Sequence, residues 1–236
     1  MFQIDLALDL ARFILVYVVY GIYAFSYIFL AYKILKRNFS RLNFLLAGFY
    51  ISGALGVIIN FIYVFIYHQL IVIILYSLTF YFLCLSLFFL LMFIIVLKKS
   101  EKFISKGIQI IMFILFSIGV MSLFFLTEGV VINESTGWKP VWSLSFTIGS
   151  LILCNITAII PTIYYSLKIY RQFSDPNLKR KWKYFLIGLL GYLFLYYGNT
   201  INLYLAVPMI RNIWGYLSML SLPFLLSIYY GVGRSF

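Results

Sequence analysis

The polar side chains inside the long apolar stretches of this chain are chiefly amides, with tyrosine, tryptophan and serine nearby. Asn60 lies about 17 residues into one such stretch, and Asn199 lies about the same distance past Lys183 in another. If both stretches are helical, with a rise of 1.5 Å per residue, each amide lies about 25 Å from the start of its helix. Amides at a shared depth can hydrogen-bond a ligand or bond one another.

Further polar and aromatic residues flank these amides and could converge with them on one pocket. The predicted ligand-binding residues are Asn60, Tyr196, Tyr197, Asn199, Asn202, Trp214, Tyr216 and Ser218, and Ser221 follows them along the chain. The alternative is that the asparagines bond between helices, where such a bond is typically worth about 0.6 to 2 kcal/mol. Asn155, which lies deeper in its stretch, fits that second role better.

Residues for catalysis or metal binding are sparse. The only histidine, His68, has no His, Asp or Glu close in sequence, and Cys84 and Cys154 each lie within an apolar stretch, as buried structural thiols do. There is no Ser-His-Asp set, no pair of carboxylates and no glycine-rich phosphate loop. We therefore expect no enzyme activity, no metal and no cofactor. Because no charged residue lies in the middle of an apolar stretch, proton pumping and charge-coupled transport are also disfavoured.

Composition places the chain in a membrane. Of its 236 residues, 64% are apolar and 10% are charged, whereas about 25% are charged in a soluble domain. The mean hydropathy is +1.05. The net charge of +12 does not indicate nucleic-acid binding, because the basic residues form short clusters between apolar segments, where lipid headgroups are the expected partners.

Seven stretches are long enough to cross a bilayer, which takes about 20 apolar residues. They cover residues 10–35, 43–67, 70–97, 107–126, 141–167, 184–205 and 213–232. The sequence therefore predicts an all-α fold, a single seven-helix transmembrane domain over residues 1–236. The first stretch lacks a basic region ahead of it and is too long for a cleavable signal, so we expect it to remain in the protein.

Charge predicts how this bundle is oriented. The loops after the first, third and fifth stretches, together with Arg234, contain 15 of the 18 lysines and arginines. Positive loops stay in the cytoplasm, because moving Lys or Arg to the bilayer centre costs about 2.5 to 3.5 kcal/mol. The N-terminus is thus predicted outside and the C-terminus inside, in a multi-pass protein of the cell membrane. Only Arg12, Lys139 and Arg211 are basic on the outer side.

The loop before the sixth stretch is the most basic surface. Its predicted lipid- or partner-binding residues are Lys168, Arg171, Lys179, Arg180, Lys181 and Lys183. Ser174 or Asp175 could cap a helix there, with Pro176 at its first position. Such a surface binds anionic lipid, at about 1 kcal/mol per basic residue, or it docks a cytoplasmic signalling protein.

The outer loop 127–140 and three prolines carry lesser signals. Asn133 matches the glycosylation pattern and lies in this loop, while Trp138 and Trp142 could anchor at the headgroups or cap an outward-facing pocket.

The prolines of the later stretches predict bends or hinges, because proline removes a backbone donor. They are Pro161, Pro208 and Pro223.

An internal repeat is suggested by two short similarities. KILKRNFS at residues 33–40 resembles KIYRQFS at 168–174, and FLLAG at 44–48 resembles FLIG at 185–188. Both pairs are about 140 residues apart. Stretches one to three would then match stretches five to seven in the same direction, with the fourth as a linker. Composition alone could also produce such short matches.

The run DPNLKRKWKYFLIG at residues 175–188, the seven stretches and the short basic loops resemble one known class. They are similar to the seven-helix sensor regions at the N-terminus of many archaeal and bacterial histidine kinases. That resemblance implies a sensor that reports to a cytoplasmic signalling domain, which here would be a separate partner. The Asp-Arg-Tyr and Asn-Pro-x-x-Tyr motifs of G-protein-coupled receptors and the Pro-Gln pairs of three-plus-one-plus-three carriers are missing.

We therefore expect a receptor-like sensor that binds a small or lipidic ligand in the outer half of the bundle and signals through its basic inner loops. A passive carrier of a small neutral solute is the alternative, and a membrane scaffold subunit without a ligand is a third.

Overall fold

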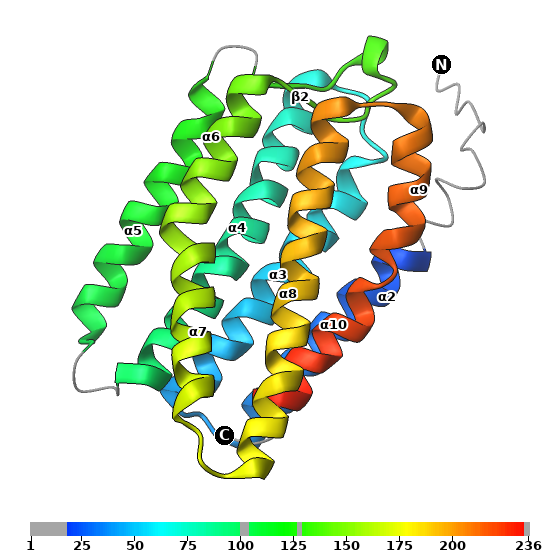
Figure 1. Ribbon diagram of the computed structural model, residues 1–236. Helices are drawn as coiled ribbons and strands as arrows, with labels where there is room; N and C mark the ends of the chain where they lie inside the picture. Colours follow the sequence, from blue (N-terminus) through cyan, green and yellow to red (C-terminus); the bar gives the residue numbers. More distant parts are fainter. Residues whose placement is uncertain (1–17, 100–103, 127–128, 234–236) are drawn as a thin grey trace.

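The protein is a bundle of long helices with one short strand pair at one end (Figure 1). The computed structural model describes residues 18–99, 104–126 and 129–233. Within these ranges, six helical segments are long and apolar enough to cross a membrane. The predicted all-α, membrane-type fold is thereby confirmed at this level.

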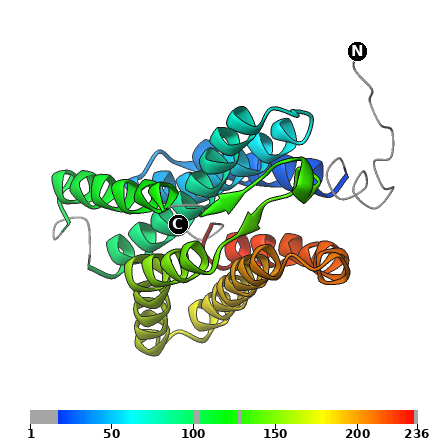
Figure 2. The same cartoon turned by 90° about the horizontal axis from the view of Figure 1, so that it is seen from above.

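Seen from above, the helices form two layers, with the strand pair over the space between them (Figure 2). The first layer contains α2 (Tyr20–Arg37), α3 (Arg41–Tyr63), α4 (Gln69–Lys99) and α5 (Lys106–Ser122). The second contains α6 (Leu144–Cys154), the π-helical turn η4 (Asn155–Ile159), α7 (Ile160–Gln172), α8 (Pro176–Leu205), α9 (Pro208–Ser218), α10 (Ser221–Ile228) and the π-helical turn η5 (Tyr229–Gly233). Short 3₁₀ turns, η2 (Leu123–Phe125) and η3 (Glu134–Thr136), flank β1 (Val130–Val131), which pairs antiparallel with β2 (Val141–Trp142).

Four of these helices are capped at their N-terminus by a side-chain oxygen that accepts a hydrogen bond from a backbone N–H of the first turn. Ser40 caps α3, Ser105 caps α5, Ser143 caps α6 and Asp175 caps α8. The Asp175 carboxylate accepts from the N–H of Asn177 at 2.9 Å, and Pro176 takes the first helical position. The helix start predicted in this loop is therefore confirmed.

Helix α4 provides the largest share of the core. It is the longest of the described helices, and it is buried by α3 in its own layer and by α7 in the other. Hydrogen bonds join the two layers at several heights. The hydroxyl of Tyr50 donates to the carbonyl of Leu225 at 2.9 Å, and Ser86 and Tyr192 share a hydrogen bond of 2.6 Å. By contrast, α5 lies at the edge and buries little of its surface.

The prolines predicted to bend helices lie at two irregularities. Before Pro161, the N–H of Ile160 bonds the carbonyl of Asn155, five residues back, which makes the π-helical turn η4. Pro223 has no N–H for the carbonyl of Met219, which accepts from Leu222 at 3.4 Å instead, and the helix is broken between α9 and α10. Pro208 simply begins α9.

The predicted spans differ from the helices mainly at their ends. Part of the first span, residues 10–17, lies outside the described residues. The second helix ends at Tyr63 rather than at residue 67, and the fifth begins at Leu144, because residues 141 and 142 pair as strand β2. The sixth begins eight residues early, at Pro176, because Asp175 caps it there.

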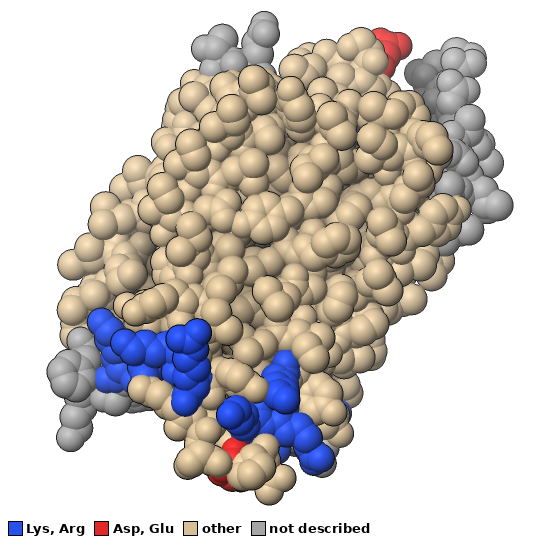
Figure 3. All heavy atoms as spheres, in the orientation of Figure 1, with Lys and Arg blue, Asp and Glu red and all other residues tan. Residues whose placement is uncertain are grey.

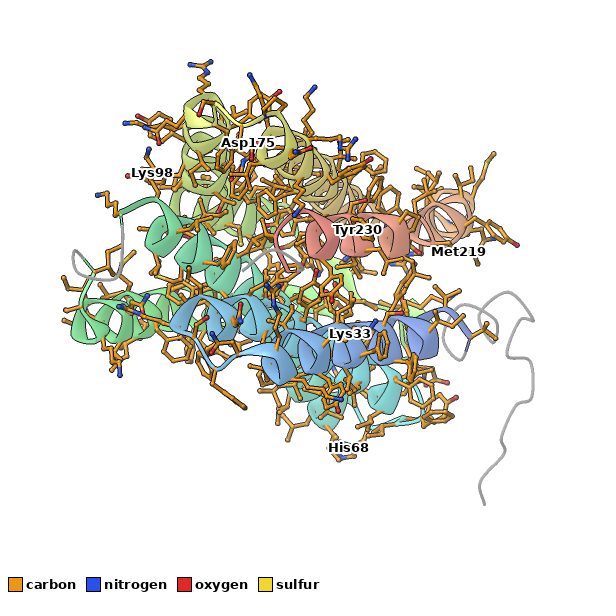
Figure 4. The ribbon with its side chains drawn as sticks, turned by 90° about the horizontal axis from the view of Figure 1, so that it is seen from below. Lys33, His68, Lys98, Asp175, Met219 and Tyr230 are labelled. Atoms are coloured by element: carbon orange, nitrogen blue, oxygen red, sulfur yellow. The ribbon has the colours of Figure 1, made fainter. Side chains whose placement is uncertain are left out.

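Basic residues gather at one end of the bundle, where α2, α4 and α7 end and α3, α5 and α8 begin (Figure 3). Seen from that end, Lys98 and Asp175 lie on the side of α7 and α8, and Lys33 lies on α2 (Figure 4). Lys98 donates to the side chain of Gln172, which ties α4 to α7 at this end. We call this the basic end. The opposite end contains the antiparallel pair of β1 and β2, and we call it the hairpin end. Of the described basic residues, only Lys139 and Arg211 lie there.

A candidate ligand cavity at the hairpin end

A cavity of about 250 Å³ opens at the hairpin end, between α3 and α4 of one layer and α8 and α9 of the other. Tyr20 of α2 contributes one wall, and the segment between η3 and β2 covers the top. The cavity thus lies at the opposite end of the bundle from the basic loops.

Four of the predicted ligand-binding residues line this cavity. Asn60 comes from α3, Asn199 and Asn202 from α8, and Tyr216 from α9. The sequence predicts that Asn60 and Asn199 lie at the same depth, and both do line this cavity although they are far apart in the chain. Asn202 is buried, at 9% exposure, whereas Asn199 is exposed.

The other four predicted residues do not line the cavity. The hydroxyl of Tyr196 donates to the carbonyl of Ser150 on α6 at 3.3 Å, and the hydroxyl of Tyr197 donates to the side chain of Asn155. Both tyrosine hydroxyls thus form hydrogen bonds that join α8 to the segment of α6 and η4. Asn155 accepts this bond while its own amide donates to the carbonyl of Leu151 at 2.7 Å, so its predicted interhelical role is confirmed.

Trp214 and Ser218 face other parts of the second layer. The Trp214 ring lies 5.6 Å from the ring of Phe194, centroid to centroid, and packs over Gly198 on α8. The Ser218 hydroxyl donates to the carbonyl of Gly215 at 2.7 Å, and the backbone carbonyl of Ser218 accepts from the hydroxyl of Tyr23. Ser221, which the sequence placed nearby, does not line the cavity either.

The structure adds residues to the cavity that the sequence did not single out. They include Tyr63 of α3, Tyr76, Thr79 and Phe80 of α4, and Arg211 and Asn212 of α9. The helical spacing of Tyr76, Thr79 and Phe80 places them on one face, but nothing in the sequence shows that this face meets Asn60. Arg211 did carry a signal, as one of only three basic residues on its side.

The covering segment forms one wall of the cavity at the hairpin end. Trp138, Lys139, Pro140 and Trp142 all line the cavity. Headgroup anchoring predicted for Trp142 is wrong, because this side chain is buried in the bundle and its Nε1 donates to the hydroxyl of Tyr76 at 2.5 Å. The alternative interpretation, that Trp142 caps a pocket, agrees with its position in the cavity wall.

Arg211 joins α9 to this cap. Its guanidinium nitrogen Nη2 donates to the carbonyl of Pro140 at 2.8 Å. Its Nε is buried and has no hydrogen-bond partner within the part of the chain that the structure describes. A guanidinium has five N–H donors, so the fixed side chain keeps donors available beside the cavity.

The basic end presents the predicted lipid- or partner-binding surface. The six predicted side chains are all exposed there: Lys168, Arg171, Lys179, Arg180, Lys181 and Lys183. Between them, Trp182 is buried and its Nε1 donates to the carbonyl of Ser166 at 2.9 Å, which fixes the start of α8 against α7. We call these six residues the basic surface.

Asn133 and His68 do not line the cavity. Asn133 lies in the hairpin segment, where its side-chain oxygen accepts from the N–H of Thr136 at 3.2 Å, and its glycosylation stays a prediction. His68 is exposed between α3 and α4 and points away from the bundle (Figure 4). The described residues contain no group of three or more His, Cys, Asp or Glu side chains that could hold a metal ion.

Comparison of the chain with models of protein families, with curated proteins and with solved structures gives no match. The class therefore follows from fold and site: an α-helical, membrane-type bundle with a polar and aromatic cavity at one end and a basic surface at the other.

Proposed function

We propose that this protein is a seven-span sensor of the cell membrane, with its hairpin end outside and its basic end in the cytoplasm. It binds a small or lipidic ligand in the cavity and passes the bound state to the basic surface. There it engages anionic lipid or a cytoplasmic signalling protein, as the resemblance to the sensor regions of histidine kinases implies.

The observation that carries this proposal is the continuity of α8. This single helix of 30 residues contains Asn199 and Asn202 near its last turn and Lys179, Arg180 and Lys181 in its first two turns. At 1.5 Å per residue it is about 45 Å long, enough to connect both sides of a bilayer. A shift of α8 at the cavity therefore moves the basic surface as well.

Helices α9 and α10 provide a place where such a shift could arise. The break between them lies at Met219, which also lines the cavity. A ligand changes the balance between two packings only by binding one of them more tightly. Contacts to both α8 and α9 give a ligand that difference in affinity.

A reporter at the basic end tests this coupling. Residue 180 is exposed, whereas the native Cys84 and Cys154 are buried. In the variant Arg180→Cys, a fluorescent maleimide should therefore label position 180 selectively. We expect a small molecule that binds the purified protein to change the emission of this label. Asn199→Leu should abolish that response, whereas Asn38→Leu, the same change at an exposed position of the basic end, should preserve it.

Binding without any change at the label would contradict the sensor. A second measurement concerns the partner itself: a cytoplasmic protein that copurifies with the chain should be lost when Lys179, Arg180 and Lys181 are all replaced by glutamine. Association that persists in this variant places the docking surface elsewhere.

The carrier alternative is favoured by one observation, the interrupted helix beside the cavity. Carriers often form their sites where membrane helices are discontinuous, as α9 and α10 are at Met219. The suggested three-plus-one-plus-three repeat would suit such a carrier. The test is the flux of a bound solute into proteoliposomes that contain the protein. Flux that occurs with the wild type and is lost with Asn199→Leu would favour transport over sensing.

A further inference from the structure

The cavity has cationic side chains and, among the lining residues that the structure describes, no carboxylate. Lys139 comes from the covering segment and Arg211 from the first turn of α9. Of the two acidic residues in the described ranges, Glu134 is exposed in η3 and does not line the cavity, and Asp175 lies at the opposite end of the bundle. A cation beside a cavity favours an anionic ligand.

Arg211 has the geometry for this role. Its bond to the carbonyl of Pro140 fixes the guanidinium at the boundary between α9 and the cap, and its buried Nε has no partner in the described residues. A carboxylate binds the fork of a guanidinium through two parallel N–H···O bonds. Such binding would use donors that the protein leaves unused.

Two further polar groups in the cavity wall point to a polar ligand. Thr79 is 3% exposed and Asn202 is 9% exposed, and Thr79 Oγ1 and Asn202 Oδ1 have no hydrogen-bond partner in the described chain. Buried polar groups are normally hydrogen-bonded. The threonine hydroxyl can donate to a ligand oxygen, and the amide of Asn202 can present its NH₂ when it is turned over.

The size and walls of the cavity limit the rest of the ligand. An apolar protein cavity of about 150 Å³ holds benzene, so about 250 Å³ leaves room for a ring with a small polar group. The side chains of Tyr63, Phe80 and Trp142 supply aromatic walls that pack against such a ring.

We propose that the ligand of this cavity is a compact, water-soluble aromatic monocarboxylate, whose carboxylate binds Arg211 and whose ring packs between α4 and the cap. This inference rests on the proposed function in that it names the ligand class of the same cavity. It does not require that binding be passed to the basic surface.

Benzoate and benzamide test the charge, because they have nearly the same shape and only benzoate is an anion. Thermal unfolding of the purified full chain in detergent is followed with increasing amounts of each compound. We expect saturable stabilisation by benzoate, with benzamide at least tenfold weaker. Arg211→Gln should weaken benzoate at least tenfold, since it removes a charge-assisted bidentate contact. Arg37→Gln, the same substitution at an exposed position of the basic end, should leave benzoate binding unchanged.

The wild-type comparison keeps the proposal testable if Arg211→Gln does not fold. Equal stabilisation by benzoate and benzamide would overturn the anionic ligand, and so would the absence of saturable stabilisation by benzoate. Acetate as effective as benzoate would overturn the aromatic part. A label at position 180 that ignores bound benzoate would instead contradict the sensor, while the assignment of Arg211 would stand.

Discussion

Tyr76 and Trp142 form the contact that fixes the cap on the bundle, with the indole Nε1 donating to the tyrosine hydroxyl at 2.5 Å. Tyr76→Phe would leave this buried donor without its acceptor. Such a loss costs about 1 to 2 kcal/mol. We expect the variant to unfold at a lower temperature in detergent, whereas Tyr164→Phe, which removes an exposed hydroxyl from α7, should behave as the wild type. Equal melting temperatures for the two variants would show that the cap does not depend on this bond.

The two cysteines offer a second test at this scale. Cys84 of α4 and Cys154 of α6 are buried, with their sulfur atoms 3.7 Å apart. The distance between bonded sulfurs is about 2.0 Å, so a small approach of the two helices would allow a disulfide. We expect diamide, a membrane-permeable oxidant, to take two electrons and two protons from the thiols, and the bond to form within one chain.

The measurement is maleimide labelling after denaturation. Two thiols should be labelled in the untreated protein and none after oxidation, with no dimer on a non-reducing gel. Cys84→Ala serves as the control, because its remaining thiol should stay reactive after the same treatment. Two reactive thiols in the oxidised wild type would mean that α4 and α6 do not meet at these residues.

The sequence located residues by depth better than by direction. Counting along two helices placed Asn60 and Asn199 at the same level, and both line the cavity. Which neighbour a side chain faces depends on how the helices pack, which a single sequence does not reveal. The sequence therefore predicts Tyr196 and Tyr197 in the pocket, although their hydroxyls bond toward α6 and η4. It identifies Arg211 as a charge on this side but not as a pocket residue.

At the scale of elements, α8 and α10 approach each other closely at a glycine. A Cβ atom at Gly188 would lie 2.6 Å from the carbonyl oxygen of Phe224 and 2.7 Å from the backbone nitrogen of Ile228. Backbone atoms cannot move aside as a flexible side chain can. Small residues of this kind allow membrane helices to pack at short distance.

Gly188→Ala should therefore push α10 away from α8 and destabilise the protein, by about 1 to 3 kcal/mol as for overpacked cores. Gly21→Ala is the matched control, because a Cβ there meets nothing within 4 Å and alanine favours a helix. Melting temperatures in detergent should fall for Gly188→Ala and stay equal or rise for Gly21→Ala. Unchanged stability of Gly188→Ala would contradict the close packing of these helices.

The boundaries of some elements can be predicted from the residue types at those positions, whereas other elements cannot be predicted from the sequence. The start of α8 was predictable because Asp175 and Pro176 are preferred at the cap and first position of a helix. Pro161 and Pro223 predicted irregularities, but not that one is a π-helical turn and the other a break. The strand β2 was missed, because two residues that pair across a long loop leave no pattern of their own.

At the scale of the whole molecule, the sequence predicted the separation of charge but not the arrangement of the helices. Basic loops alternate with nearly neutral ones along the chain, so antiparallel helices collect them at one end (Figure 3). The two layers and the pairing of α4 with α7 result from side-chain packing between distant segments. The position of the cavity between the layers follows from that packing.

The same separation of charge predicts the orientation in the membrane, because each lysine or arginine moved into the bilayer centre costs about 2.5 to 3.5 kcal/mol. In intact cells, a membrane-impermeant maleimide should label Ser135→Cys, which is exposed at the hairpin end, but not Lys98→Cys or Lys181→Cys at the basic end. All three should be labelled after permeabilisation. The wild type is the control, because its two cysteines are buried. Labelling of Lys98→Cys and Lys181→Cys from opposite sides would mean that α4 and α8 do not share a cytoplasmic end, and α8 could then not connect an outer cavity to an inner basic surface.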